Sequence, residues 1–341
     1  MKKFIYALLT VLLILVGLEK AWDFLIKENN NIKLSYAVQG GLENELLIHG
    51  PCEPLFTISP KYLDSITGII SYNYALRHTD FADNYLHLYL YLKHNKAPNQ
   101  MYLYVTPESF DLRFNTFHTF RFAAWLEDSL VSEVVKEMDP DYAKYTWIPF
   151  MKYAYYNTYK TFDALQGFKH WINSGKDPYF ADGHVPHGPT AYTNEPDNQL
   201  NGYIAPKNLS YANGNDVEQL EEGGTYYEIY DSAQTFEWDT TREKYLRLII
   251  ELAQKKGVEV HLYESTPYRG SVVSQPNRQE FLHRTHDLAK EFNVEYLVFD
   301  SLELGKTKAN FVCPLILGEQ SGKLFMREFA KTITIGSIYG K

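Results

Sequence analysis

The chain has 341 residues, of which 45% are hydrophobic, so it can bury one large core or two smaller ones. Its formal net charge of -9, without any basic stretch to offset it, argues against a surface that binds nucleic acid. Tyr and Phe are unusually frequent, with 28 and 20 residues, which suits sugar grooves or membrane interfaces as well as ordinary core packing.

The N-terminus predicts a membrane anchor. Lys2 and Lys3 precede an uninterrupted apolar run over residues 4–17, the pattern of an export signal. The run continues into LEKAWDFLI without a small-x-small cleavage site. An uncleaved anchor with its lysines in the cytoplasm is therefore favoured over a removed signal peptide or a buried core helix. We expect residues 1–26 to form a single membrane helix with Trp22 at headgroup level, and the rest of the chain to be extracytoplasmic.

After a polar linker over residues 27–44, apolar runs of strand length alternate with helical patterns. Several of the runs lack polar alternation, as expected for strands that are covered on both faces. The predicted strands are 45–50, 68–75, 100–107, 257–266 and 294–301, and the predicted helices are 80–95, 240–257 and 277–292. This alternation predicts an α/β fold, with a mostly parallel sheet and helices on both sides.

Residues 108–237 interrupt the alternation with aromatic helical segments and then a loop-rich stretch. We expect a helical insertion after the third strand that lies over the carboxyl ends, where such sheets bind ligands. Asp182 and His184, both in this insertion, are candidate contacts to a polymer substrate. His184 and His187 are three residues apart, but without carboxylate or cysteine partners nearby a solvated loop is favoured over a metal site. Neither a metal nor a cofactor is predicted.

Three motifs carry a resemblance to a known family. They are IHGPCEPLFTISP after the first predicted strand, SYNYALRHTDFADNYLHLYLYLKHN from residue 71, and YLYVTPESF from residue 102. They resemble motifs of membrane-anchored SGNH (GDSL) hydrolases, especially those that accompany membrane-bound O-acyltransferases in the acylation of cell-surface polymers. The resemblance spans essentially the whole chain outside the insertion. It implies a three-layer, flavodoxin-like SGNH fold over residues 45–341.

The resemblance also implies that the family's catalytic site is degenerate here. It places Gly50 on the motif glycine and Cys52 on the nucleophilic serine. Arg77 and His78 replace a Ser-Gly pair whose glycine helps to bind the oxyanion. Asn84, in the Asn-Tyr pair of the same motif, is a candidate substrate contact.

The last motif, FVCPLILGEQSGKLFMREFA, is similar to the family's Asp-Pro-x-His-Leu-Asn followed by a helix, and it places Cys313 on the aspartate and Ile316 on the histidine. Isoleucine cannot take up a proton, so ordinary Ser-His-Asp hydrolysis is not expected. Two interpretations of Cys52 stay open. It is either a thiolate with His78 as its base, since His49 should face away on its strand, or one half of a disulfide with Cys313, with two buried thiols as a further alternative.

The sequence and the resemblance together predict a catalytically degenerate, extracytoplasmic protein with a single anchor. We expect it to be an accessory or binding partner of a membrane-bound O-acyltransferase in the acylation or export of a cell-envelope polysaccharide. One alternative is an acyltransferase or esterase that depends on Cys52. The other is a carbohydrate-binding protein that has no membrane protein as its partner.

Overall fold

The computed structural model describes residues 1–29, 33–76, 79–113, 117–155, 160–173, 235–272, 275–313 and 315–333. Its centre is a sheet of five strands, each of which lies within one of the predicted runs. The strands are β1 (Leu46–His49), β2 (Ser71–Asn73), β3 (Gln100–Tyr104), β4 (Glu259–Glu264) and β5 (Glu295–Val298). They pair in the order β2-β1-β3-β4-β5, and all four pairings are parallel. The α/β fold with a parallel sheet is thus confirmed, and its strand order is the one found in flavodoxin-like sheets.

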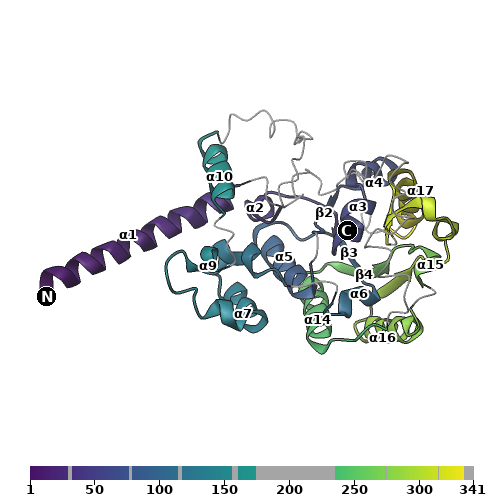
Figure 1. Cartoon of the computed structure of the whole chain (residues 1–341). Helices are drawn as coiled ribbons and strands as arrows, with labels where there is room; N and C mark the ends of the chain where they lie inside the picture. Colours follow the sequence, from purple (N-terminus) through teal and green to yellow (C-terminus); the bar gives the residue numbers. More distant parts are fainter. Residues whose placement is uncertain are drawn as a thin grey trace.

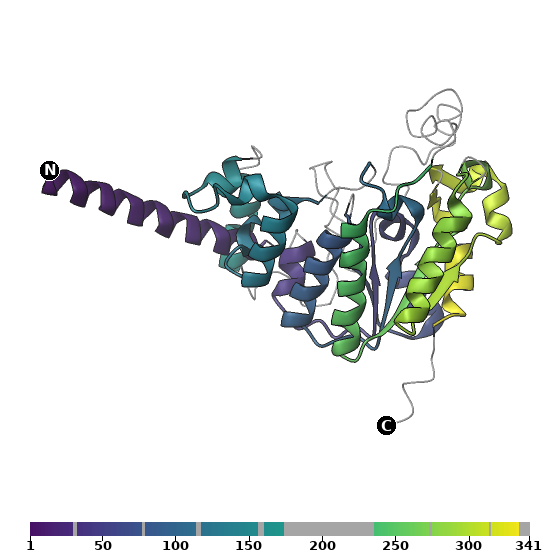
Figure 2. The same ribbon diagram turned by 90° about the horizontal axis from the view of Figure 1, so that it is seen from below.

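Helices cover both faces of this sheet (Figures 1 and 2). One face carries α5 (Phe81–His94), α14 (Thr240–Lys255) and α16 (Arg278–Glu291), and the other carries α4 (Pro60–Thr67) and α17 (Glu319–Ala330). Neighbouring residues of β1 divide between the two resulting cores, with Leu47 in the first and Ile48 in the second. Alternate side chains of a strand point to opposite faces of the sheet, and here helices cover both faces. Neighbouring residues are therefore both apolar, which explains the runs without polar alternation.

The N-terminal helix α1 (Lys2–Lys27) projects from the body of the molecule, with the N-terminus at its far end (Figure 1). It contains a stretch of 18 residues with a mean hydropathy of 2.0 that is not buried at all, so it is long and apolar enough to cross a membrane. Its last turns behave differently, since Asp23 and Ile26 are buried. The first part of α1 therefore projects as an exposed apolar helix, whereas its last turns pack into the folded domain.

A buried ionic cluster joins α1 to the domain. The Nζ atom of Lys152, in α9 (Met151–Ala154), lies 2.7 Å from Oδ2 of Asp23 and 3.0 Å from Oε1 of Glu19. The hydroxyl of Tyr153 donates a hydrogen bond to Asp23, and the backbone N–H of Phe150 donates one to Glu19. Charges that are buried in this way persist where they are paired, so these contacts hold the end of α1 in one place.

The segment predicted as a polar linker contains a helix, α2 (Lys33–Val38), that is packed into the core. Lys33 is 1% exposed, and its Nζ donates to the carbonyl of Ala75 at 2.5 Å. The hydroxyl of Ser35 donates to the carbonyl of Ile26 in α1 at 2.9 Å. Trp22, which was expected at headgroup level, is half-buried and lies edge-on to Phe150 at 6.3 Å between ring centroids.

The insertion after β3 is helical where the structure describes it. Its elements are α6 (Pro107–Phe110), η1 (Thr119–Trp125), α7 (Ser129–Met138), α8 (Pro140–Ala143), α9 and α10 (Thr161–Asn173). From η1 to α10 these helices pack against one another, against α1 and against α5, beside the sheet. Residues 174–234 of the insertion lie outside the described residues, so its expected place over the carboxyl ends stays a prediction. The remaining short elements are α3 (Cys52–Thr57), α15 (Arg269–Val272), η3 (Glu303–Lys306), η4 (Lys308–Asn310) and an antiparallel pair, β6 (Phe311–Cys313) and β7 (Ile316–Leu317).

Candidate functional site

The strand order places the point at which the winding of the sheet reverses between β1 and β3. Ligands of such sheets bind outside the carboxyl ends of the strands at this point. Two tight turns meet here, one from β1 into α3 and one from β3 into α6. Gly50 has a φ of 143°, and a Cβ atom on it would lie 2.8 Å from Cβ of Tyr104 and 3.0 Å from Cγ of Pro54. Glycine is thus required for the two turns to approach each other this closely.

Cys52 begins α3 directly behind this glycine turn and is half-buried. It packs against a small apolar cluster formed by Leu55, Phe56, Ala75 and Ile316. The structure therefore brings together Cys52 and Ile316, two positions far apart in the sequence that the resemblance assigned to one catalytic triad. Where such a triad has its base, this cluster has the aliphatic side chain of Ile316, which is 9% exposed.

The partner of Ile316 across the β6–β7 pair is Cys313, the position that the resemblance assigned to the aspartate. The side chain of Cys313 lies outside the described residues, so its bond with Cys52 stays a prediction. The chemical consequence of Ile316 does not depend on that bond. An isoleucine in the cluster next to Cys52 offers no atom that can accept the proton of a thiol or a hydroxyl.

The histidine closest in sequence to this turn belongs to a different environment. His49 is fully buried and lies 5.4 Å from the ring of Tyr74 and 6.5 Å from that of His87 in α5. Burial lowers the pKa of His49 to about 3, and the nearby cation of Lys33 adds to this. The ring is therefore neutral near pH 7 and packs under α5, in line with the expectation that it faces away from Cys52.

A group of buried carboxyl groups surrounds the same carboxyl ends. Glu53 follows Cys52, and its Oε2 atom is buried without a hydrogen-bond partner among the described residues. Burial raises the pKa of Glu53 to about 8, and the charge of Glu108 raises it further. A carboxyl group with such a pKa holds its proton at neutral pH, so it can donate a hydrogen bond or act as an acid.

Glu108, in α6 just after β3, is the second member of this group. It is 3% exposed, burial raises its pKa, and it accepts a hydrogen bond of 3.1 Å from the side chain of Gln275. Glu264, at the end of β4, forms two hydrogen bonds with Arg278, of 2.7 and 2.9 Å. The charge of Glu264 raises the pKa of Arg278 against the effect of burial, so this guanidinium remains charged.

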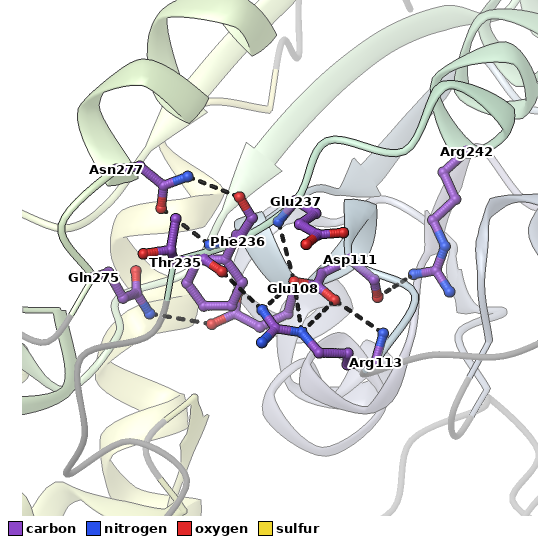
Figure 3. Close-up of polar contacts among 9 residues, drawn as sticks. All are labelled: Glu108, Asp111, Arg113, Thr235, Phe236, Glu237, Arg242, Gln275 and Asn277. Atoms are coloured by element: carbon purple, nitrogen blue, oxygen red, sulfur yellow. Dashed lines mark hydrogen bonds and ion pairs between the residues drawn. The ribbon is translucent and has the colours of Figure 1, made fainter.

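A polar network holds the chain in place after Glu108 (Figure 3). Arg113 forms an ion pair of 2.5 Å with Asp111, and the backbone N–H of Glu237 donates to the same carboxylate at 3.1 Å. Arg242, from α14, donates to the carbonyl of Asp111 at 2.7 Å. The two ends of the insertion are thereby tied together beside the carboxyl ends of the sheet, which fixes the position of α6 and its glutamate.

The other predicted site residues lie elsewhere. Asn84 is in the first turn of α5 and is 2% exposed, and its role as a substrate contact stays a prediction. His78, Asp182 and His184 fall outside the described residues, and their predicted roles stay predictions. In the ranges that the structure does describe, no group of three or more His, Cys, Asp or Glu side chains is arranged to hold a metal ion.

A depression of about 640 Å³ lies at another part of the surface, between α16 and β5. Its lining includes His283, His286 and Tyr296. It is open and belongs to the edge strand of the sheet, whereas the residues discussed above gather at the carboxyl ends of β1, β3 and β4. The switch point is therefore the better candidate for a functional site.

Sequence reasoning missed Glu53 and Glu108. A signal for them was present, because each glutamate follows a predicted buried strand by a few residues, in HGPCE and in YVTPE. Carboxyl ends of parallel strands meet at one edge of the sheet, so acidic residues in both turns could have been expected to converge.

The arrangement thus joins the half-buried Cys52, the apolar side chain of Ile316, and the acidic groups of Glu53 and Glu108, whose pKa values burial raises. It can bind a ligand or donate hydrogen bonds, but it does not present the ionised base of a hydrolytic triad at Ile316. No protein-family profile matches the chain, and a search of curated proteins found no significant match.

Proposed function

We propose that this chain is a catalytically degenerate SGNH-like protein that is anchored in the membrane by α1, with its domain on the extracytoplasmic side. Its proposed role is that of an accessory or binding partner of a membrane-bound O-acyltransferase, in the acylation or export of a cell-envelope polysaccharide. The pathway rests on the motif resemblance. The loss of hydrolytic activity rests on the residues of the site.

One observation carries the proposal most directly, namely that Cys52 packs against an apolar cluster of which Ile316 is a member. It supports the motif frame, because the two positions belong to the same triad in that frame although they are far apart in the sequence. It also supports degeneracy, because the position of the base is apolar and buried. The 2-1-3-4-5 strand order is compatible with an SGNH fold and supports it at the level of topology.

Genetic complementation tests the accessory role. We expect deletion of the gene to lower the ester content of an envelope polysaccharide, and both the unaltered chain and Cys52→Ala to restore it. Crosslinking of the full chain in native membranes, followed by mass spectrometry, should recover a multi-spanning O-acyltransferase. Unchanged esters after deletion, with no acyltransferase recovered, would reject the accessory role and favour a carbohydrate-binding protein without a membrane partner.

A second candidate function, a Cys52-dependent acyltransferase or esterase, is favoured by the acidic groups beside the thiol. Burial raises the pKa values of Glu53 and Glu108, so these groups favour the protonated form that an acyl-transfer reaction can use as an acid. Turnover of p-nitrophenyl acetate and acetylated glycans by the full chain decides between the two. Activity that is abolished by Cys52→Ala and kept by Cys313→Ala would establish the thiol enzyme, and so would a complementation experiment in which Cys52→Ala fails and Cys313→Ala succeeds.

A further inference from the structure

Helix α10 exposes several large apolar side chains to solvent. Phe162 and Leu165 are each 60% exposed, Phe168 is 45%, Trp171 is 49% and Ile172 is 57%. The first four recur at intervals of three residues, and Ile172 follows Phe168 by four, so they share one broad side of the helix. Water-facing helices seldom keep a side of this kind, which therefore marks an interaction surface.

The structure fixes where this surface lies relative to α1. Gly167 of α10 packs so closely on α1 that a Cβ atom there would lie 1.6 Å from the carbonyl oxygen of Leu25. At the same level, Trp171 lies edge-on to Phe24 of α1, with 5.9 Å between the ring centroids, and Phe24 is itself 44% exposed. The apolar side of α10 is thus continuous with the exposed surface of the projecting helix.

The length of α1 places this contact at the surface of a bilayer. A hydrocarbon core of about 30 Å needs roughly 20 helical residues. The exposed apolar residues of α1 run from Phe4 to Leu18, which at 1.5 Å per residue covers about 22 Å. The apolar run ends about 10 Å along the helix before Leu25, on whose carbonyl α10 is seated, so the contact lies just beyond the end of the hydrocarbon span, at the level of the headgroups.

From this we infer that α10 lies in the interface of the bilayer, with the side formed by Phe162, Leu165, Phe168, Trp171 and Ile172 inserted among the headgroups and the upper acyl chains. Aromatic residues are enriched at this depth, and amphipathic helices bind there through their apolar side. The inference rests on the proposed anchoring by α1. A lipid surface is favoured over a protein partner because the apolar side of α10 continues the surface that α1 presents to lipid.

Site-specific photocrosslinking in membranes tests the inference with the full chain. The photoreactive residue p-benzoyl-phenylalanine is placed at Leu165 in α10. A matched control at Leu324, which is 47% exposed on α17 in the body of the domain, reports on an exposed leucine away from α1. A control at Leu13, which is 73% exposed on α1, reports on the anchor itself. Membranes carry alkyne-tagged fatty acids in their lipids, so that lipid adducts are detected directly.

We expect lipid adducts at Leu13 and Leu165 and none at Leu324. Adducts at Leu13 without any at Leu165 would overturn the interfacial placement and leave the anchor intact. Adducts of Leu165 with a protein, in place of lipid, would overturn it in favour of a docking surface for that protein. An absence of lipid adducts at Leu13 would reject the anchor and, with it, the inference.

Discussion

Replacement of Arg278 by methionine tests whether the carboxyl ends of the sheet contain an ionised pair. Arg278 and Glu264 are 4% and 1% exposed and are joined by hydrogen bonds of 2.7 and 2.9 Å. Arg278→Met leaves the carboxylate of Glu264 buried without its cation, and breaking a buried pair in this way costs about 3 to 5 kcal/mol. The double variant Glu264→Gln/Arg278→Met contains no buried charge at this pair, so we expect it to be clearly more stable than the single variant.

The pH dependence gives this prediction a sign. Burial already raises the pKa of Glu264 to about 7 in the folded chain, although the charge of Arg278 lowers it, so this pKa rises further when the cation is removed. The folded variant then binds a proton that the unfolded chain releases, so stability falls as pH increases and the loss caused by Arg278→Met is larger at pH 8 than at pH 5. Urea unfolding of the full chain in detergent, followed at both pH values, measures it. An equal loss at the two pH values, or a double variant as unstable as the single one, would refute the reasoning.

Three further predictions concern the switch point and the junction of α1. Burial raises the pKa of Glu53 from 4.5 to about 8, so the folded chain keeps a proton that the unfolded chain loses, and the free energy of unfolding should fall as pH rises through this range. Glu53→Gln should flatten this dependence of the free energy of unfolding on pH, measured by urea unfolding. An unaltered slope would contradict the assignment. Gly167→Val should push α10 away from the carbonyl oxygen of Leu25 and speed proteolysis within residues 161–173, whereas unchanged protection would show that the close contact is not needed. Thiol labelling of the denatured, unreduced chain should find no free thiol and a peptide crosslinked between Cys52 and Cys313, and two labelled thiols would exclude the disulfide.

The strands were predictable because the hydrophobic pattern of each run is visible in its own local sequence. A strand covered on both faces has no polar alternation, and the runs around Leu47 and Leu103 show this without any knowledge of distant residues. Helix α2 was missed for the opposite reason. Its lysine, Lys33, is buried, although lysine is rarely buried. The carbonyl of Ala75 that accepts its hydrogen bond is 42 residues away, so the local sequence does not indicate this partner.

The same distinction applies to the candidate site. The motif frame assigns Cys52 and Ile316 to one site because spacing and residue type are visible in the sequence, and in the fold Cys52 packs against the apolar cluster that contains Ile316. The raised pKa values of Glu53 and Glu108 are not visible there, since they depend on how deeply segments from elsewhere in the chain bury these residues. Sequence patterns therefore indicate which residues meet, whereas the charge that they carry follows from the completed packing.

The rigid junction between α1 and the domain determines the freedom of motion of the whole molecule. A flexible tether over residues 27–44 would have an end-to-end distance of roughly 20 to 25 Å and would let the domain tumble beside the membrane. Lys152, paired with Asp23 and Glu19 of α1, removes that freedom, because the last turns of the helix cannot leave the domain without exposing or unpairing these charges. When α1 is embedded, the carboxyl ends of the sheet are then held at one height and one angle above the lipid. Under the proposed function, a polymer chain would meet the carboxyl ends only where it passes at that fixed height above the lipid.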